Sequence, residues 1–253
     1  MIDIHCHLEY MENPEQVVDE AKQKMTAIIS SVADIKDKEK ILELAKKNKG
    51  FVFVSLGFHP ERINKYSDFE INEYIQFIRD NKEKIVAIGE CGLDYLQVKD
   101  RERSKAVFIK FIELAKELSL PLVLHVRDEP GSNAVFDDIF NILEKHELTA
   151  VLHCFSGSEG QLKTAIERGY YISYATIVCK SDKHKRLAEK TPLESMLLET
   201  DSPWLHPTSR EMINRPWMIV ESAKVISELK NTIPEKIMQK TEENAKKVFK
   251  LEV

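Results

Sequence analysis

Histidine and carboxylate side chains stand directly after several short apolar runs of the sequence. Five of the eight histidines do so, together with one glutamate and one aspartate. These residues are His5, His7, His59, Glu90, His125, His153 and Asp201. Each has an ordinary explanation when taken alone, since a lone histidine is usually hydrogen-bonded structure and Asp201 could cap the segment that follows it. Their repetition after separate runs makes chance placement improbable and indicates one shared site.

The residue types in this set predict a metal centre. Neutral imidazoles and carboxylates are the nitrogen and oxygen ligands that bind Zn²⁺, Mn²⁺, Fe²⁺ and Mg²⁺. The candidate ligands are His5, His7, Glu90, His125, His153 and Asp201. So many ligands suit two ions about 3.5–4 Å apart better than one tetrahedral ion. Because such a pair activates a water and stabilises developing negative charge, we predict metal-assisted hydrolysis, with Asp201 as the group that accepts the water's proton.

Competing catalytic motifs are weak in this chain. The run Phe155-Ser156-Gly157-Ser158 is not a G-x-S-x-G elbow, so a serine triad is not expected. Neither G-x-G-x-x-G after an apolar run nor G-x-x-x-x-G-K-[ST] occurs, which predicts no nucleotide cofactor. His146 and His184 stand in charged helical runs and are given no role, whereas His206, just past Asp201, is a weaker candidate for a substrate contact.

The elements that must position these residues follow from the alternation of apolar and amphipathic runs. Strands are expected at 1–5, 26–31, 51–56, 85–89, 120–125, 150–153, 170–174 and 195–199. Helices are expected at 15–24, 36–47, 69–81, 101–118, 137–145, 160–168, 182–190, 216–229 and 234–249. This order predicts an α/β fold, a TIM (β/α)₈ barrel that forms a single domain over residues 1–253, with an open doubly wound sheet as the alternative. In a barrel the carboxyl ends of the strands converge on one face, where the candidate ligands would meet.

Composition limits the function classes. The 253 residues carry a net charge of −5, so no global basic field would draw the protein onto nucleic acid. The four cysteines form no C-x-x-C pair, which suits a reducing compartment. No signal peptide or membrane-spanning segment is recognisable, and we expect a cytoplasmic protein with no membrane partner.

At the candidate residues the sequence resembles the TatD family of metal-dependent hydrolases and deoxyribonucleases, which belong to the amidohydrolase-like barrels. The shared motifs occur in order over nearly the whole chain. They are DIHCHL at 3–8, GFHP at 57–60, IGECGLDY at 88–95, LPLVLHVRD at 120–128, HCFSGS at 153–158 and LLETDSPWL at 197–205. Any one of these motifs would be weak evidence, but the collinear series is specific.

The resemblance implies a role for each matched residue. One metal would be held by His5, His7, Glu90 and Asp201, and the second by Glu90, His125 and His153. Glu90 would bridge the two ions, which makes Glu90 and Asp201 the implied catalytic residues. His59 would contact substrate phosphate, and Arg127 would either bind phosphate or anchor a structural ion pair.

Two departures from the family pattern bear on substrate contacts. The family often carries Arg-Asn-x-Pro after the last strand, whereas this chain has Ile213-Asn214-Arg215-Pro216. Asn214 and Pro216 fit, so Asn214 is an expected substrate-binding residue, but Ile213 replaces the arginine. Val126 stands where the family usually has a small polar residue.

Three functions are compatible with these features. The leading hypothesis is a deoxyribonuclease that uses two divalent ions (Mg²⁺, Mn²⁺ or Zn²⁺) on a single strand or 3′ end of DNA, since an end needs fewer phosphate contacts than a duplex. The second is an amide or ester hydrolase with the same site, such as an aminoacyl-tRNA deacylase, because one barrel site hosts several chemistries. The third is a non-catalytic metal-binding protein. A self-contained barrel is expected to be a monomer.

Overall fold

Eight parallel strands form one sheet in which each strand pairs with the next along the chain. The computed structural model describes residues 1–253. The strands are β1 (Ile2–Cys6), β2 (Ala27–Val32), β3 (Val52–Leu56), β4 (Ala87–Asp94), β5 (Leu122–Arg127), β6 (Ala150–Leu152), β7 (Tyr171–Tyr174) and β8 (Met196–Leu198). Two backbone hydrogen bonds join the end of the first strand to the segment after the last strand and so connect the two edges of the sheet. His7 N donates to Ser202 O (2.8 Å), and Asp201 N donates to His5 O (3.0 Å). The predicted TIM barrel is confirmed, and this strand order excludes the open doubly wound sheet.

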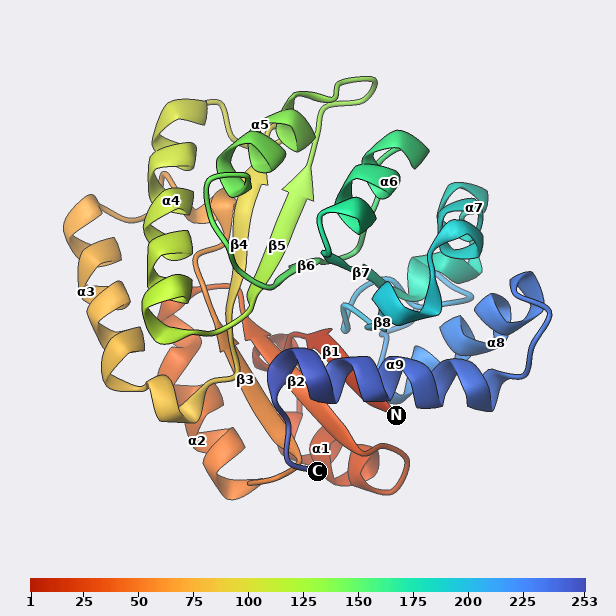
Figure 1. Ribbon diagram of the computed structural model, residues 1–253. Helices are drawn as coiled ribbons and strands as arrows, with labels where there is room; N and C mark the ends of the chain where they lie inside the picture. Colours follow the sequence, from red (N-terminus) through yellow and green to blue (C-terminus); the bar gives the residue numbers. More distant parts are fainter.

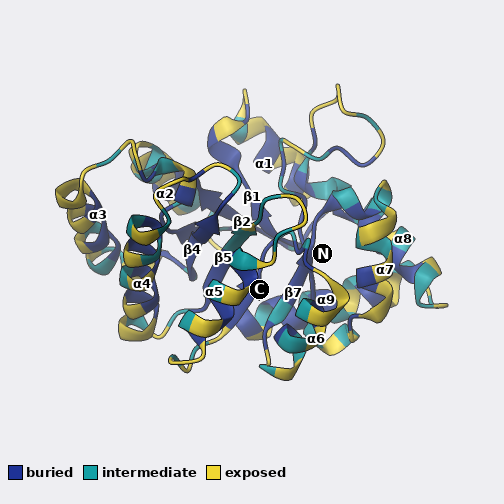
Figure 2. Cartoon of the chain, turned by 90° about the horizontal axis from the view of Figure 1, so that it is seen from above, coloured by how far each residue is buried: buried dark blue, intermediate teal, exposed yellow.

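Helices surround the sheet and turn one apolar face toward it. They are α1 (Pro14–Lys22), α2 (Lys38–Lys47), α3 (Asp68–Asp80), α4 (Arg101–Leu118), α5 (Ala134–Leu143), α6 (Glu159–Glu167), α7 (Asp182–Lys190), α8 (Ile219–Leu229) and α9 (Pro234–Phe249). In α4 the residues Phe108, Phe111, Ile112 and Ala115 are all buried, as their helical spacing predicts. Figure 2 shows the buried residues in the central strands and the exposed ones on the outer helix faces. No helix combines the length and the apolar character needed to cross a membrane.

The two ends of the barrel are built differently. At the end where the strands begin, α9 lies across the opening (Figure 1). Its Val248 and Phe249 join the apolar cluster inside the barrel. The strand residues of that cluster are Ile2, Ile4, Ala27, Ile29, Ala87, Val123, Val151 and Leu197. This end is therefore sealed by apolar packing, which leaves the opposite end for polar groups.

Side-chain alternation along the strands carries polar residues to that opposite end. On β5, Val123 faces the interior and the next inward position is His125. On β6, Val151 is followed in the same way by His153. In each case a ligand-type residue takes the last inward position of an otherwise apolar strand face.

In β1 and β4, an irregularity in the strand pairing turns ligand-type residues toward the interior. The pairing register of β1 with β2 shifts between Asp3 and Cys6, and that of β4 with β5 shifts between Ile88 and Cys91. Because a bulge re-aims the side chains beside it, His5 and Glu90 point inward, although strict alternation from Ile4 and Ala87 would turn them outward.

Two of the observed strands extend two or more residues beyond their predicted ends. β4 continues to Asp94 and β5 to Arg127, where the sequence predicted ends at 89 and 125. The continuation depends on Gly92, whose φ is +145° and whose added Cβ would lie 2.1 Å from His125 O. A glycine at this position lets the two strands run together past the candidate ligands.

Candidate metal centre

Glu90 lies at the centre of the polar end of the barrel, and its two oxygens face different histidines. Oε2 lies 3.4 Å from His5 Nε2 and 3.9 Å from His7 Nε2. Oε1 lies 2.5 Å from His125 Nδ1 and 3.5 Å from His153 Nε2. The carboxylate thus stands between two histidine pairs, the arrangement that a bridging ligand needs.

Asp201 completes the first of these groups. Its Oδ1 lies 3.5 Å from His7 Nε2 and 4.0 Å from His5 Nε2, while the two Nε2 atoms are 3.1 Å apart. The structure therefore brings together all six residues expected to hold metal, from β1, β4, β5 and the ends of β6 and β8.

The surroundings of these carboxylates fit a bound cation. Glu90 is buried, and no lysine or arginine nitrogen lies within 4 Å of the carboxylate of Glu90 or Asp201. Buried negative charge needs compensation, and the donors here are nitrogen and oxygen ligands of the kind that divalent ions take. Residues that could hold an ion include the groups His5, His7, Glu90 and His59, Glu90, His125.

The protonation of the site follows from these contacts. Burial alone would raise the pKa of Glu90, but the positive charge of His153 and His125 lowers it well below its usual value, so the carboxylate is ionised. Burial would lower the pKa of His125, yet Glu90 and Asp94 raise it to about 9. For His153, Glu199 and Glu90 likewise outweigh burial and raise the pKa to about 10. A metal ion that takes these nitrogens must displace protons.

Three carboxylates behind the histidines were not singled out from the sequence. Glu9 Oε1 lies 3.2 Å from His7 Nδ1, Asp94 Oδ2 lies 3.0 Å from His125 Nε2, and Glu199 Oε1 lies 2.8 Å from His153 Nδ1. Each carboxylate holds the ring nitrogen that faces away from Glu90 or Asp201, which orients the ring and makes its other nitrogen a better ligand. The sequence did offer a sign of two of these carboxylates. Asp94 lies in the same motif as the candidate ligand Glu90, at 88–95, and Glu199 lies in the same motif as Asp201, at 197–205.

A cavity of about 460 Å³ opens over the ligands, and His59 and Arg127 line it. His59 Nε2 lies 3.6 Å from Glu90 Oε1, and burial lowers the pKa of this histidine to about 3, so its ring is neutral. Arg127 is half exposed, and its Nη1 lies 3.8 Å from Glu61 Oε1. Arg62, which the sequence did not single out, is a second guanidinium in the same wall.

Asn214 does not reach this cavity. It is fully buried, and its Nδ2 donates to Thr176 Oγ1 (2.9 Å) and Thr200 O (3.0 Å), while its Oδ1 accepts from Arg215 N. These bonds tie Asn214 to the segment just after β8 and to the segment after β7. In this structure Asn214 therefore supports the loop that carries Asp201 and lines no cavity at the site.

The remaining histidines lie outside the ligand cluster. His146 Nδ1 lies 3.2 Å from Glu113 Oε1 on α4, remote from the centre. His206 Nδ1 accepts from the backbone amides of Thr208 and Ser209 and so shapes the loop after β8. His184 lines a second cavity next to the metal centre, although the sequence gave no reason to assign it a role.

Comparison with known proteins agrees with this geometry. The family model described as "TatD related DNase" matches residues 2–250. An uncharacterized metal-dependent hydrolase of Methanocaldococcus jannaschii is 35% identical over 92% of this chain and 93% of its own length. A protein of Erwinia billingiae named 3′-5′ ssDNA/RNA exonuclease TatD is 29% identical over 99% of both chains. The crystal structure of a TatD homologue from Escherichia coli superposes with a TM-score of 0.90 at 29% identity, over 100% of this chain and 98% of that one.

Proposed function

Because this chain belongs to the TatD family of metal-dependent hydrolases, we propose that it removes nucleotides from the 3′ end of single-stranded DNA with two divalent ions. The observation that carries this proposal is the placement of Glu90, whose two oxygens face separate histidine pairs. The family membership supports hydrolysis of phosphoester bonds, and the exonuclease name belongs to one relative.

The side chains divide the binding work between two positions. One ion would be held by His5, His7 and Asp201. The other would be held by His125 and His153, and Glu90 would bind both ions. When bound, such a pair supplies an activated water and neutralises charge on a phosphoryl group. Mg²⁺, Mn²⁺ and Zn²⁺ all suit the nitrogen and oxygen donors present.

The groups around the ions have distinct tasks. Burial would raise the pKa of Asp201, but His7, His153 and His5 lower it, so this carboxylate is ionised and able to accept the proton of the attacking water. Arg127 and Arg62 place positive charge on the wall of the cavity, where a phosphate would lie. The neutral His59 lies beside Glu90 and can donate a hydrogen bond to an oxygen of the same phosphate.

The shape of the site favours a strand end over a duplex. The cavity of about 460 Å³ is of the size that holds a small ligand, and the chain has a net charge of −5. A duplex would need a broad basic footprint, which this composition does not supply.

The proposal is tested with 5′-labelled single and double strands in the presence of Mg²⁺, Mn²⁺ or Zn²⁺. We expect single strands to shorten progressively from the 3′ end. Glu90→Ala and Asp201→Ala should abolish this shortening, whereas His146→Ala, outside the site, should not change it. A wild-type protein that cleaves no DNA with any of these ions but hydrolyses esters or aminoacyl-tRNA would overturn the nuclease assignment in favour of an ester hydrolase.

A further inference from the structure

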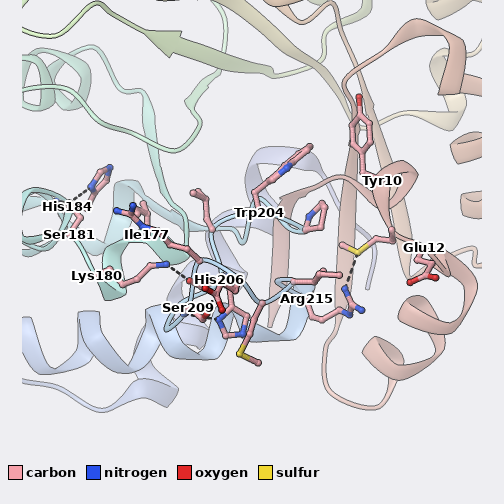
Figure 3. Close-up of a pocket in the computed structure, with 17 residues that line it drawn as sticks. Tyr10, Glu12, Ile177, Lys180, Ser181, His184, Trp204, His206, Ser209 and Arg215 are labelled. Atoms are coloured by element: carbon pink, nitrogen blue, oxygen red, sulfur yellow. Dashed lines mark hydrogen bonds between the residues drawn. The ribbon is translucent and has the colours of Figure 1, made fainter.

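A second and larger cavity, of about 1120 Å³, adjoins the metal centre (Figure 3). Its walls come from three segments: the 3₁₀ helix η1 (Leu8–Tyr10), the region of η5 (Thr176–Cys179) and α7, and the loop between β8 and α8. Tyr10 and Trp204 line both this cavity and the one over the ligands, so the two cavities meet at these side chains. A ligand too long for the smaller cavity would pass Trp204 to reach the larger one.

Aromatic rings stand at the junction of the two cavities. The ring centroids of Tyr10 and Trp204 are 5.3 Å apart, and Trp204 lies 5.1 Å from the ring of His7. The indole is 46% exposed and the phenol 39%, although large apolar surfaces are normally covered. In the view of Figure 3, Trp204 stands between Tyr10 on one side and Lys180 and His184 on the other. Exposed rings beside a strand-cleaving site are suited to stacking on nucleobases.

The same cavity carries three positively charged side chains that form no ion pair. Lys180, Arg210 and Arg215 line it, and none of their charged nitrogens has a carboxylate oxygen within 4 Å. Lys180 donates instead to His206 O, and Arg215 to Asn214 O (3.3 Å). Glu12 and Glu211 are the two carboxylates among the lining residues. In a chain with a net charge of −5, a cavity whose fixed cations outnumber its carboxylates fits an anionic ligand.

We propose that this cavity binds the nucleotides that precede the 3′-terminal one in a single-stranded substrate. Their bases would stack on Trp204 and Tyr10, and their phosphates would lie against Arg210, Arg215 and Lys180. The volume supports a ligand longer than one nucleotide, because pockets of roughly 300–1,000 Å³ already hold drug-sized molecules. This inference rests on the proposed function and adds to it a second binding region, which makes the enzyme sensitive to substrate length.

Trp204 allows a test that does not depend on activity. The chain has two tryptophans, and Trp217 lies outside this cavity with Lys24 Nζ 4.0 Å from its ring centroid. In a Trp217→Phe protein loaded with Mg²⁺, the fluorescence of Trp204 is titrated with thymidylates of one to six nucleotides joined by phosphorothioate linkages that slow hydrolysis. We expect saturable quenching, with an affinity at least fivefold higher for three nucleotides than for one. If thymidine monophosphate and the longer strands bound with equal affinity, the proposal would be overturned.

Kinetics give the second arm of the test. Trp204→Leu or Arg210→Ala should raise KM for an eight-nucleotide strand about tenfold and change kcat for that strand much less. The rise in KM should be smaller for a dinucleotide, which places a single nucleotide in the larger cavity. Both side chains are exposed, so the variants are expected to fold. Arg186→Ala, exposed on α7 and outside the cavity, is the control for a general loss of positive charge. Unchanged KM in both variants would reject the second binding region while leaving the nuclease intact, whereas a wild-type protein that hydrolyses neither substrate would reject the proposed function.

Discussion

His153 Nδ1 lies 2.8 Å from Glu199 Oε1, and the same carboxylate oxygen accepts a hydrogen bond from Cys154 N at 2.8 Å. Glu199 is completely buried at the end of β8, so the strand that leads to Asp201 also orients a histidine from β6. Glu9 and Asp94 stand in the same relation to His7 and His125. The histidines of the candidate metal centre are thus each backed by a carboxylate on the side away from Glu90.

The substitution Glu199→Gln tests this support. Glutamine keeps the size of the side chain and can still accept from Cys154 N, but it removes the negative charge beside His153. We expect metal affinity to fall about 10- to 100-fold, because outer carboxylates orient the ring and make its other nitrogen a better ligand. Calorimetric titration of the metal-free protein with Zn²⁺ measures this, and the circular dichroism spectrum should not change. Unaltered affinity would show that His153 needs no such partner.

Metal binding should also stabilise the fold, because the ligands come from β1, β4, β5 and the ends of β6 and β8. An ion present at a hundred times its dissociation constant adds about 2.7 kcal/mol to the free energy of unfolding. For a domain of this size that corresponds to a rise in Tm of roughly 5–10 °C. Thermal unfolding with EDTA and with Mn²⁺ gives the difference directly. Glu90→Gln should remove most of the rise and His146→Ala none of it, so equal rises in both variants would place the stabilising ion elsewhere.

Local patterns explain why the sequence predicted the barrel and brought the six ligand residues to one end. Apolar runs and the polar residues after them are both visible along the chain. The bulges that turn His5 and Glu90 inward were not predictable, since strict alternation from Ile4 and Ala87 points the other way. Glu199 lies in a motif that the sequence showed, but its partner His153 could not be predicted, because the two residues are 46 positions apart. Asn214 fitted a motif, yet its bonds to Thr176 and Thr200 keep it away from the open site.

Asp34 gives a prediction about acid stability. It is buried and accepts hydrogen bonds from Tyr66 Oη and from Lys65 Nζ (2.5 Å). Burial would raise the pKa of this carboxyl, but the bonds from Lys65 and Tyr66 lower it. A lowered folded-state pKa means that the contribution to stability is complete above the unfolded value of about 3.9 and is lost as the pH falls toward the folded one.

Asp34→Asn should therefore cost about 1.5–3 kcal/mol of unfolding free energy at pH 7, the range for hydrogen bonds to a charged group. The difference from the wild type should shrink as the pH is lowered from about 5 to 3. Urea unfolding at a series of pH values measures it. Asp19→Asn, at an aspartate whose side chain is 74% exposed, is the matched control and should have little effect at any pH. A constant penalty for Asp34→Asn across this range would mean that the ionised form of Asp34 adds nothing.

Phe249 tests the sealed end of the barrel separately from the metal centre. This side chain of α9 is 2% exposed and packs with the interior residues of the strands, at the end opposite the ligands. Phe249→Ala should lower the free energy of unfolding by about 3–5 kcal/mol, because it leaves a cavity in a closely packed cluster. Metal affinity and kcat at 25 °C should stay within about twofold of the wild type, since the ligands are held by the strands. Lys247→Ala, at an exposed position of the same helix, controls for the change in helix propensity and should cost less than about 0.5 kcal/mol. If Phe249→Ala instead abolished metal binding without a comparable loss of stability, the two ends of the barrel would be coupled, and the separation between an apolar seal and a polar centre would be wrong.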